Sequence, residues 1–258
     1  MIKTIDKKII KRNFSKYARQ YDKYSLIQRS CALRLISKLG NTNFKSILDI
    51  GCGTGIYTRF LRDRFRGARI KAIDISDDMI EVAKEKLPDK KTEFIVGDAE
   101  TMDFKEEFDL ITSNASLQWF TNLEKTLIKH KMLLSEKGVI AFSMFGPETF
   151  SELSESLKEL FGKDSFISSH SFVTNSELRK ILKNLFNNVT VEDARYSRRY
   201  GSLAELLKSI KYSGIRGRGA NRKTVWVQGV MKELEKIYLD KFKNIVARYQ
   251  VFFCKGER

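Results

Sequence analysis

The residue pattern with the clearest chemical potential is an aspartate followed by three alternating glycines, Asp49-Ile50-Gly51-Cys52-Gly53-Thr54-Gly55. Glycine has no Cβ atom, so a ligand can lie directly against the backbone N–H groups of such a turn. A helix that follows the turn would place its positive end there, while Asp49 offers a negative charge nearby. The pattern therefore favours a ligand that carries both an anionic group and an ammonium group, and the alternative is a tight turn without a ligand.

Two further acidic residues follow predicted strands. Asp74 ends the apolar run 69–74, where a carboxylate can accept hydrogen bonds from both hydroxyl groups of a ribose. The run 92–96 leads into Asp98 and Ala99, whose carboxylate and backbone N–H suit the amino group and ring nitrogen of adenine. Ile75 and Met79 are placed to contact a base, although both could equally belong to the core. Together these residues predict a nucleoside site.

The elements that must position these residues form an alternation of strands and helices. Residues 47–50 predict an interior strand of a parallel sheet and residues 56–65 a helix, which makes the glycines a strand-to-helix turn. Helices are also expected over 8–38, 149–161, 178–186 and 206–211, the last two after capping boxes at Thr174 and Ser202. Further strands are expected over 69–74, 92–96, 108–113, 139–145, 188–194 and 244–253. This order predicts an α/β fold with a seven-stranded, mostly parallel sheet and an antiparallel edge.

The length of 258 residues suits one domain with a single large core. We expect an N-terminal helical lid over 1–45, a cofactor-binding core over 46–195, a helical cap over 196–242 and a final strand over 243–258. No segment has the apolar character of a signal peptide or a membrane span, which favours a cytoplasmic protein.

The three cysteines Cys31, Cys52 and Cys254 are widely spaced and lack a C-x-x-C pair. With only two histidines in the chain, neither a disulfide framework nor a metal site is expected. Cys52 could be a redox-sensitive thiol, or a small residue that a tight turn tolerates.

Charge is distributed unevenly along the chain, which has 48 Lys and Arg against 32 Asp and Glu and a formal net charge of +16. Residues 1–45 carry a net +10 and residues 195–258 a net +11, whereas residues 46–194 carry a net −5. Such asymmetry favours an acidic partner, either nucleic acid or an acidic protein, that approaches the two flanks. General solubility is the alternative explanation.

Three tyrosines, Tyr17, Tyr21 and Tyr24, lie within eight residues of the first predicted helix. If this helix closes over the glycine turn, their phenol groups would meet the cofactor or the acceptor. The alternative is packing against the edge of the sheet.

The D-x-G-x-G-x-G form of the turn resembles the first motif of the S-adenosylmethionine-dependent methyltransferases, and differs from the G-x-G-x-x-G of dinucleotide sites. This resemblance implies a Rossmann-like class I methyltransferase fold with S-adenosylmethionine as cofactor and S-adenosylhomocysteine as product. The cofactor-binding residues that it implies, together with the contacts argued above, are Asp49, Gly51, Cys52, Gly53, Gly55, Asp74, Ile75, Met79, Asp98, Ala99 and Asn114. The loop 114–120 lacks the Asn/Asp-Pro-Pro-aromatic sequence of several enzymes that methylate nucleobase amines.

Four stretches, residues 13–22, 26–28, 113–119 and 142–150, look like the malonyl-acyl-carrier-protein O-methyltransferases of biotin synthesis. This resemblance implies methylation of the free carboxylate of malonyl-acyl-carrier protein or malonyl-CoA at the start of pimeloyl synthesis. A malonyl carboxylate has a pKa of about 3 to 4, so it is already a nucleophile at pH 7 and needs no general base.

The acceptor site is expected to use Tyr21, Gln118 and Trp119, with Arg218 as a candidate to bind the carboxylate beside Arg216 and Arg222. The implied partner is an acidic acyl carrier protein, with no nucleic acid, membrane or metal, and the chain is expected to be a monomer. The alternatives are a tRNA, rRNA or DNA methyltransferase, which only the charge supports, and a non-catalytic partner subunit.

Overall fold

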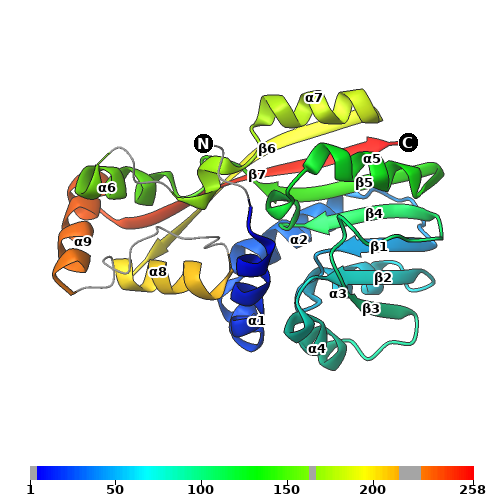
Figure 1. The fold of residues 1–258 in the computed structure, drawn as a ribbon, viewed down its shortest axis with the longest axis horizontal. Coiled ribbons are helices and arrows are strands. Elements are labelled where there is room, and N and C mark those ends of the chain that lie inside the picture. Colours follow the sequence, from blue (N-terminus) through cyan, green and yellow to red (C-terminus); the bar gives the residue numbers. More distant parts are fainter. Residues whose placement is uncertain (1–4, 163–166, 215–227) are drawn as a thin grey trace.

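A seven-stranded sheet forms the centre of the protein in a computed structural model, which describes residues 5–162, 167–214 and 228–258 (Figure 1). Its spatial order is β3-β2-β1-β4-β5-β7-β6. The strands are β1 Ser46–Ile50, β2 Arg69–Asp74, β3 Thr92–Val96, β4 Phe108–Asn114, β5 Leu134–Phe145, β6 Asn187–Tyr200 and β7 Ile245–Glu257. Strands β1 to β5 pair in parallel, and β7 runs antiparallel to both β5 and β6. The predicted α/β class and the mostly parallel sheet are confirmed.

Helices cover both faces of the sheet because neighbouring residues of the central strands point to opposite sides. Ile47 belongs to an apolar cluster with α2 and α3, whereas Leu48 belongs to a cluster with α5 and α7. The helices are α1 Lys7–Tyr24, α2 Leu26–Lys38, α3 Ile56–Arg64, α4 Asp77–Lys86, α5 Leu123–Met132, α6 Ser151–Phe161, α7 Asn175–Leu185, α8 Leu203–Tyr212 and α9 Gln228–Phe242. Within the described ranges, none of them is long and apolar enough to cross a membrane.

The expectation of one helix over residues 8–38 is wrong, because the chain breaks at Ser25. Ser25 has φ −93° and ψ 36°, ends α1 and precedes α2. The residue is fully buried, so the break is set by packing of the two helices and not by a glycine or proline. Because of this break, α1 does not continue along the sheet face that α2 covers.

Strands β6 and β7 extend well past the rest of the sheet and carry the cap (Figure 1). Helices α6, α8 and α9 gather around this extension, and α1 stands between it and the β1–β4 half. The capping box at Thr174 is confirmed. At Ser202 only half of the expected box forms, since Glu205 accepts from the N–H of Gly201 instead of Ser202.

Candidate functional site

The glycine turn has the backbone shape that its sequence predicts. Gly51, Gly53 and Gly55 have φ values of 68°, 54° and 81°, in the left-handed region that side chains disfavour. A Cβ atom on Gly51 would lie 1.9 Å from Oγ of Ser116, so the loop after β4 packs directly on the turn. A Cβ atom on Gly53 would meet no atom within 4 Å, which leaves open space on that side.

Asp74 links the turn to the helix that follows β2. Its Oδ2 accepts from the N–H of Gly53 at 2.9 Å, and its Oδ1 accepts from the N–H of Ser76 at 2.9 Å. Burial raises the pKa of this carboxyl above its ordinary value, against the lowering effect of these backbone bonds. Asp74 thus holds the turn in shape and presents a carboxylate at the carboxyl end of the sheet.

A cleft with about 690 Å³ of empty space, part of it open to solvent, lies over the turn. The predicted site residues that line it are Tyr21, Gly51, Gly53, Asp74, Ile75, Met79, Asp98, Ala99, Asn114 and Trp119. These residues come from α1, from the ends of β2 and β4 and from the segments that follow β1 to β4, so the fold brings together parts of the chain that are far apart in sequence. Their roles toward a ligand stay predictions.

Four predicted residues lie behind the cleft and do not line it: Asp49, Cys52, Gly55 and Gln118. Gly55 is the left-handed residue before α3 and packs on Ala83. Gln118 braces its own loop, because its Nε2 donates to the carbonyl of Ala115 at 2.7 Å. Burial raises the pKa of the Cys52 thiol, which favours the protonated thiol and the interpretation of a small residue in a tight turn.

Asp49 is fully buried beneath the turn. Its Oδ2 accepts from Oγ1 of Thr58 at 2.7 Å, and its Oδ1 has no hydrogen-bond partner among the described residues. Burial raises the pKa of this carboxyl to about 7, with a further increase from the nearby charge of Asp74. Asp49 has no direct access to the cleft. The backbone N–H groups of the glycine turn above it fit the amino-acid end of S-adenosylmethionine, as Asp74 and Asp98 fit its nucleoside end.

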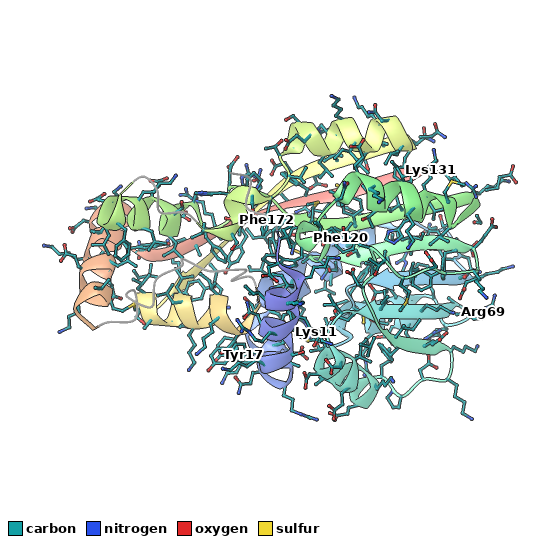
Figure 2. All side chains as sticks on the ribbon, viewed as in Figure 1. Lys11, Tyr17, Arg69, Phe120, Lys131 and Phe172 are labelled. Carbon is teal, nitrogen blue, oxygen red and sulfur yellow. The ribbon has the colours of Figure 1, made fainter. Side chains whose placement is uncertain are left out.

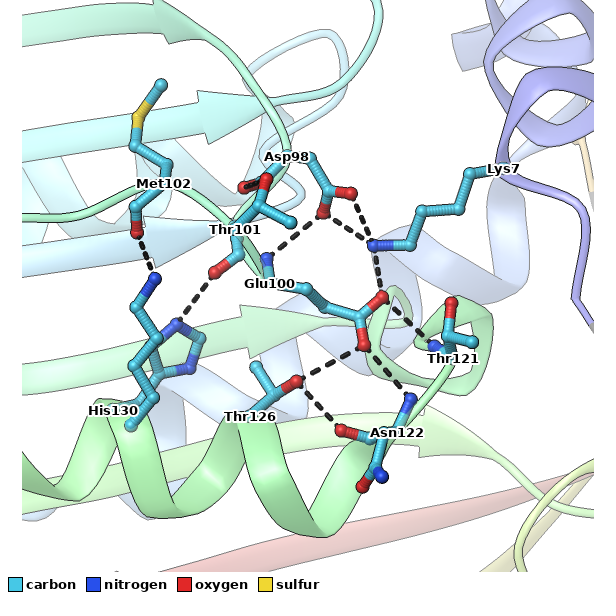
Figure 3. Close-up of polar contacts among 11 residues, drawn as sticks. Lys7, Asp98, Glu100, Thr101, Met102, Thr121, Asn122, Thr126 and His130 are labelled. Carbon is cyan, nitrogen blue, oxygen red and sulfur yellow. Dashed lines mark hydrogen bonds and ion pairs between the residues drawn. The ribbon is translucent and has the colours of Figure 1, made fainter.

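Lys7 is the residue of this site that the sequence did not reveal (Figure 3). Its Nζ lies 2.5 Å and 2.6 Å from the two carboxylate oxygens of Asp98 and also pairs with Glu100. It lies 5.4 Å from the ring centre of Phe120. Glu100 in turn accepts from the N–H groups of Thr121 and Asn122, at 3.0 Å each. Lys7 is 91 residues from Asp98, and no local pattern signals such a contact.

Helix α1 covers the nucleoside side of the cleft through several polar contacts. The hydroxyl groups of Ser15 and Ser76 are 2.8 Å apart, and Oγ1 of Thr54 in the glycine turn donates to Asp22 at 2.5 Å. Apolar Ile10 and Phe14 add to the lining. The expectation that residues 1–45 act as a lid stays a prediction.

The three tyrosines of α1 divide between two environments. Tyr21 lines the cleft, whereas Tyr17 and Tyr24 pack against Tyr212 of α8, each with ring centres 4.8 Å apart. The three arginines expected near the acceptor, Arg216, Arg218 and Arg222, lie outside the described residues.

Comparison with known proteins identifies relatives of this chain. A family model described as "Methyltransferase domain" matches residues 48–142. "Malonyl-[acyl-carrier protein] O-methyltransferase 2" of Ilyobacter polytropus is 36% identical over 256 residues, 98% of this chain and 93% of the relative. The "Malonyl-[acyl-carrier protein] O-methyltransferase" of Acetivibrio thermocellus is 37% identical over 98% of this chain and 95% of its own.

Solved structures share the fold at lower identity. The YcgJ protein of Bacillus subtilis has a TM-score of 0.60 at 17% identity, over 88% of this chain and 97% of its own. A phosphoethanolamine N-methyltransferase of Haemonchus contortus, solved with S-adenosyl-L-methionine, has a TM-score of 0.56 at 21% identity, over 87% of this chain and 51% of its own. The identity and coverage of the two bacterial relatives show that the chain belongs to the family of malonyl-[acyl-carrier protein] O-methyltransferases.

Proposed function

We propose that the chain is an S-adenosylmethionine-dependent carboxyl O-methyltransferase that esterifies the free carboxylate of a malonyl thioester on acyl carrier protein. The observation that carries the proposal is the similarity over nearly the whole chain, cap included, to relatives of that name. The cleft supports it, because glycine turn, Asp74 and Asp98 lie together at one edge of the sheet.

The residues of the cleft suit the two ends of the cofactor. Asp74 would accept the ribose hydroxyls, and Asp98 with the N–H of Ala99 would bind adenine. The open side of Gly53 would receive the methionine part. When bound, S-adenosylmethionine supplies a methyl group activated by a sulfonium.

The lining of the cleft suits an acceptor that is already ionised. No histidine is among the described lining residues. His130 lies behind Ala99, where burial lowers the pKa of its ring to about 4, and His170 contacts Ser154 of α6. A malonyl carboxylate needs alignment and a dry surrounding more than a general base.

Aromatic side chains would exclude water from the reacting groups. Trp119 and Phe14 line the cleft, and the indole of Trp119 packs edge-on against Phe172 with ring centres 5.2 Å apart. Tyr21 presents its phenol to the same space. Burial and the charges of Asp74 and Asp22 raise the pKa of this phenol, so Tyr21 stays a hydrogen-bond donor at neutral pH.

The relatives do not support the alternative of nucleic-acid methylation, because those that span the chain are named for a carrier-protein substrate. A direct test incubates the protein with methyl-labelled S-adenosylmethionine and, separately, malonyl carrier protein, acetyl carrier protein, malonyl-CoA and bulk RNA. We expect base-labile label on malonyl carrier protein and none on the acetyl form, which has no free carboxylate. Label on RNA alone, or on no acceptor, would refute the proposal.

A further inference from the structure

Three lysines lie around three tyrosines whose rings are in contact at the junction of α1 and α8. We call Lys16, Lys23, Lys211, Tyr17, Tyr24 and Tyr212 the lysine–tyrosine cluster. Lys16 and Lys211 lie over the same ring, with Nζ 5.7 Å and 5.6 Å from the centre of Tyr17. Lys211 also lies over Tyr212, and Lys23 lies over Tyr24 at 6.0 Å.

Among the residues that the structure describes, no acid pairs with the lysines of this cluster. None of the three lysines forms an ion pair within the described part of the chain. Asp22, the neighbour of Lys23, accepts a hydrogen bond from Thr54 and forms an ion pair with Lys86. Residues 215–227, which follow α8 in the sequence, contain four basic residues and no acidic one. Gathering like charges without a counterion costs free energy that a cation–π contact offsets only in part.

Three other basic residues of α1 do have acidic partners. Lys7 pairs with Asp98, Lys11 with Asp77, and Arg19 with Glu81 and Glu85. All of these acids belong to the cofactor half, and Figure 2 shows Lys11 on the side of α1 toward α4 and Tyr17 on the side toward α8. Lys16 and Lys23 are exposed and pair with none of these acids.

We infer that the lysine–tyrosine cluster is the docking surface for an acidic carrier protein. The inference rests on the proposed function and adds the location of the surface to which the partner binds. An excess of positive charge steers an acidic protein and fixes its orientation, while tyrosine rings supply rigid contact area of the kind found at interface centres. Tyr17 and Tyr24 are one helical turn from Tyr21, which lines the cleft, so a partner docked there holds its tethered thioester beside the reaction site.

The test compares two double variants that change the net charge equally. Lys16→Glu with Lys23→Glu reverses two charges of the cluster. Arg69→Glu with Lys91→Glu reverses two exposed charges at the opposite end of the sheet, where Figure 2 shows Arg69. Binding of purified malonyl-loaded acyl carrier protein is measured by calorimetry at low salt. Methyl transfer is measured with this carrier and with the malonyl thioester of N-acetylcysteamine, which has no protein to dock.

We expect the cluster variant to lose roughly tenfold or more in carrier affinity and in kcat/KM for the carrier, while the small thioester reacts as before. The sheet-end variant should match the wild type throughout. Equal loss of carrier affinity in both variants, or unchanged carrier affinity in the cluster variant, would overturn the inference. Carrier binding that depends on the cluster without methylation of either thioester would support the docking surface and refute the proposed function.

Discussion

Lys7 and Asp98 form an ion pair across the mouth of the cofactor cleft, with both carboxylate oxygens of Asp98 within 2.6 Å of the ammonium group. The two side chains are about a quarter exposed, at 22% and 24%. In the proposed function the amino group of adenine donates to the same carboxylate. Under that proposal lysine and cofactor would compete for one acceptor, and Glu100 would still pair with the lysine.

Replacing Lys7 by methionine should strengthen the binding of S-adenosylmethionine. The variant has no ion pair to break, and a pair this exposed contributes about 0.5 to 1 kcal/mol, or about two- to fivefold in affinity. Titration calorimetry checks this value. Lys8→Met is the matched control, because Lys8 is exposed and forms no ion pair with the described residues. Weaker binding by the Lys7 variant would mean that the lysine holds the cofactor in place.

Two alanine substitutions in the glycine turn should have different effects. Both impose a left-handed conformation on alanine, at about 1 to 2 kcal/mol each. Only Gly51→Ala adds an overlap with Ser116, and overpacking of this kind costs about 1 to 3 kcal/mol more. Gly53→Ala places its methyl group in open space at the cleft, so it should impair cofactor binding more than folding. Urea unfolding and calorimetry separate the two effects, and equal unfolding free energies would contradict the packing described for Ser116.

Asp74→Ala should weaken cofactor binding by roughly 1 to 3 kcal/mol through the lost bonds to the ribose. The substitution also removes the acceptor for Gly53, so part of the loss will come from a looser turn. Asp77→Ala is the matched control: it removes a carboxylate three residues away that is exposed and pairs with Lys11. Unchanged affinity in the Asp74 variant would refute the ribose contact.

The stability of the protein should depend on pH through Asp49. Its folded-state pKa of about 7 lies above the ordinary value of 3.8, so folding favours the protonated form. This contribution is complete below about pH 4 and is lost as the pH rises toward 7, with a slope of at most about 1.4 kcal/mol per pH unit. Urea unfolding across this range should show a flatter pH profile for Asp49→Asn than for the wild type. Parallel profiles would show that Asp49 does not titrate there.

Local patterns predicted the half of the fold that carries the cofactor residues. Strand β2 was expected where it occurs, because an apolar run ends on an acid within a few residues. The residues after β1, β2 and β3 meet at one edge because the strands are parallel neighbours. Such information is contained in short stretches of sequence.

Contacts between distant segments could not be predicted in this way. The break at Ser25 depends on the burial of that residue. Helix α5 was not expected, although Asn122 caps it. Lys7 lines the cleft only because the fold brings α1 next to Asp98, 91 residues further along the chain. Asp49 was expected to contact a ligand directly but lies behind the turn. Its side chain is fully buried and accepts a hydrogen bond from Thr58 of α3. The sequence pointed to three carboxylates but did not reveal that Asp74 and Asp98 line the cleft whereas Asp49 does not.

The pairing of β6 with β7 has a consequence for how this family can change. Tyr200 at the end of β6 pairs directly with Ile245 at the start of β7. The ladder therefore holds the two ends of the cap segment together independently of what lies between them. Lengthening such a closed segment costs little, only about 0.6 kcal/mol for each doubling. The segment between the two strands can therefore vary in length among related proteins while the strands of the sheet keep their register.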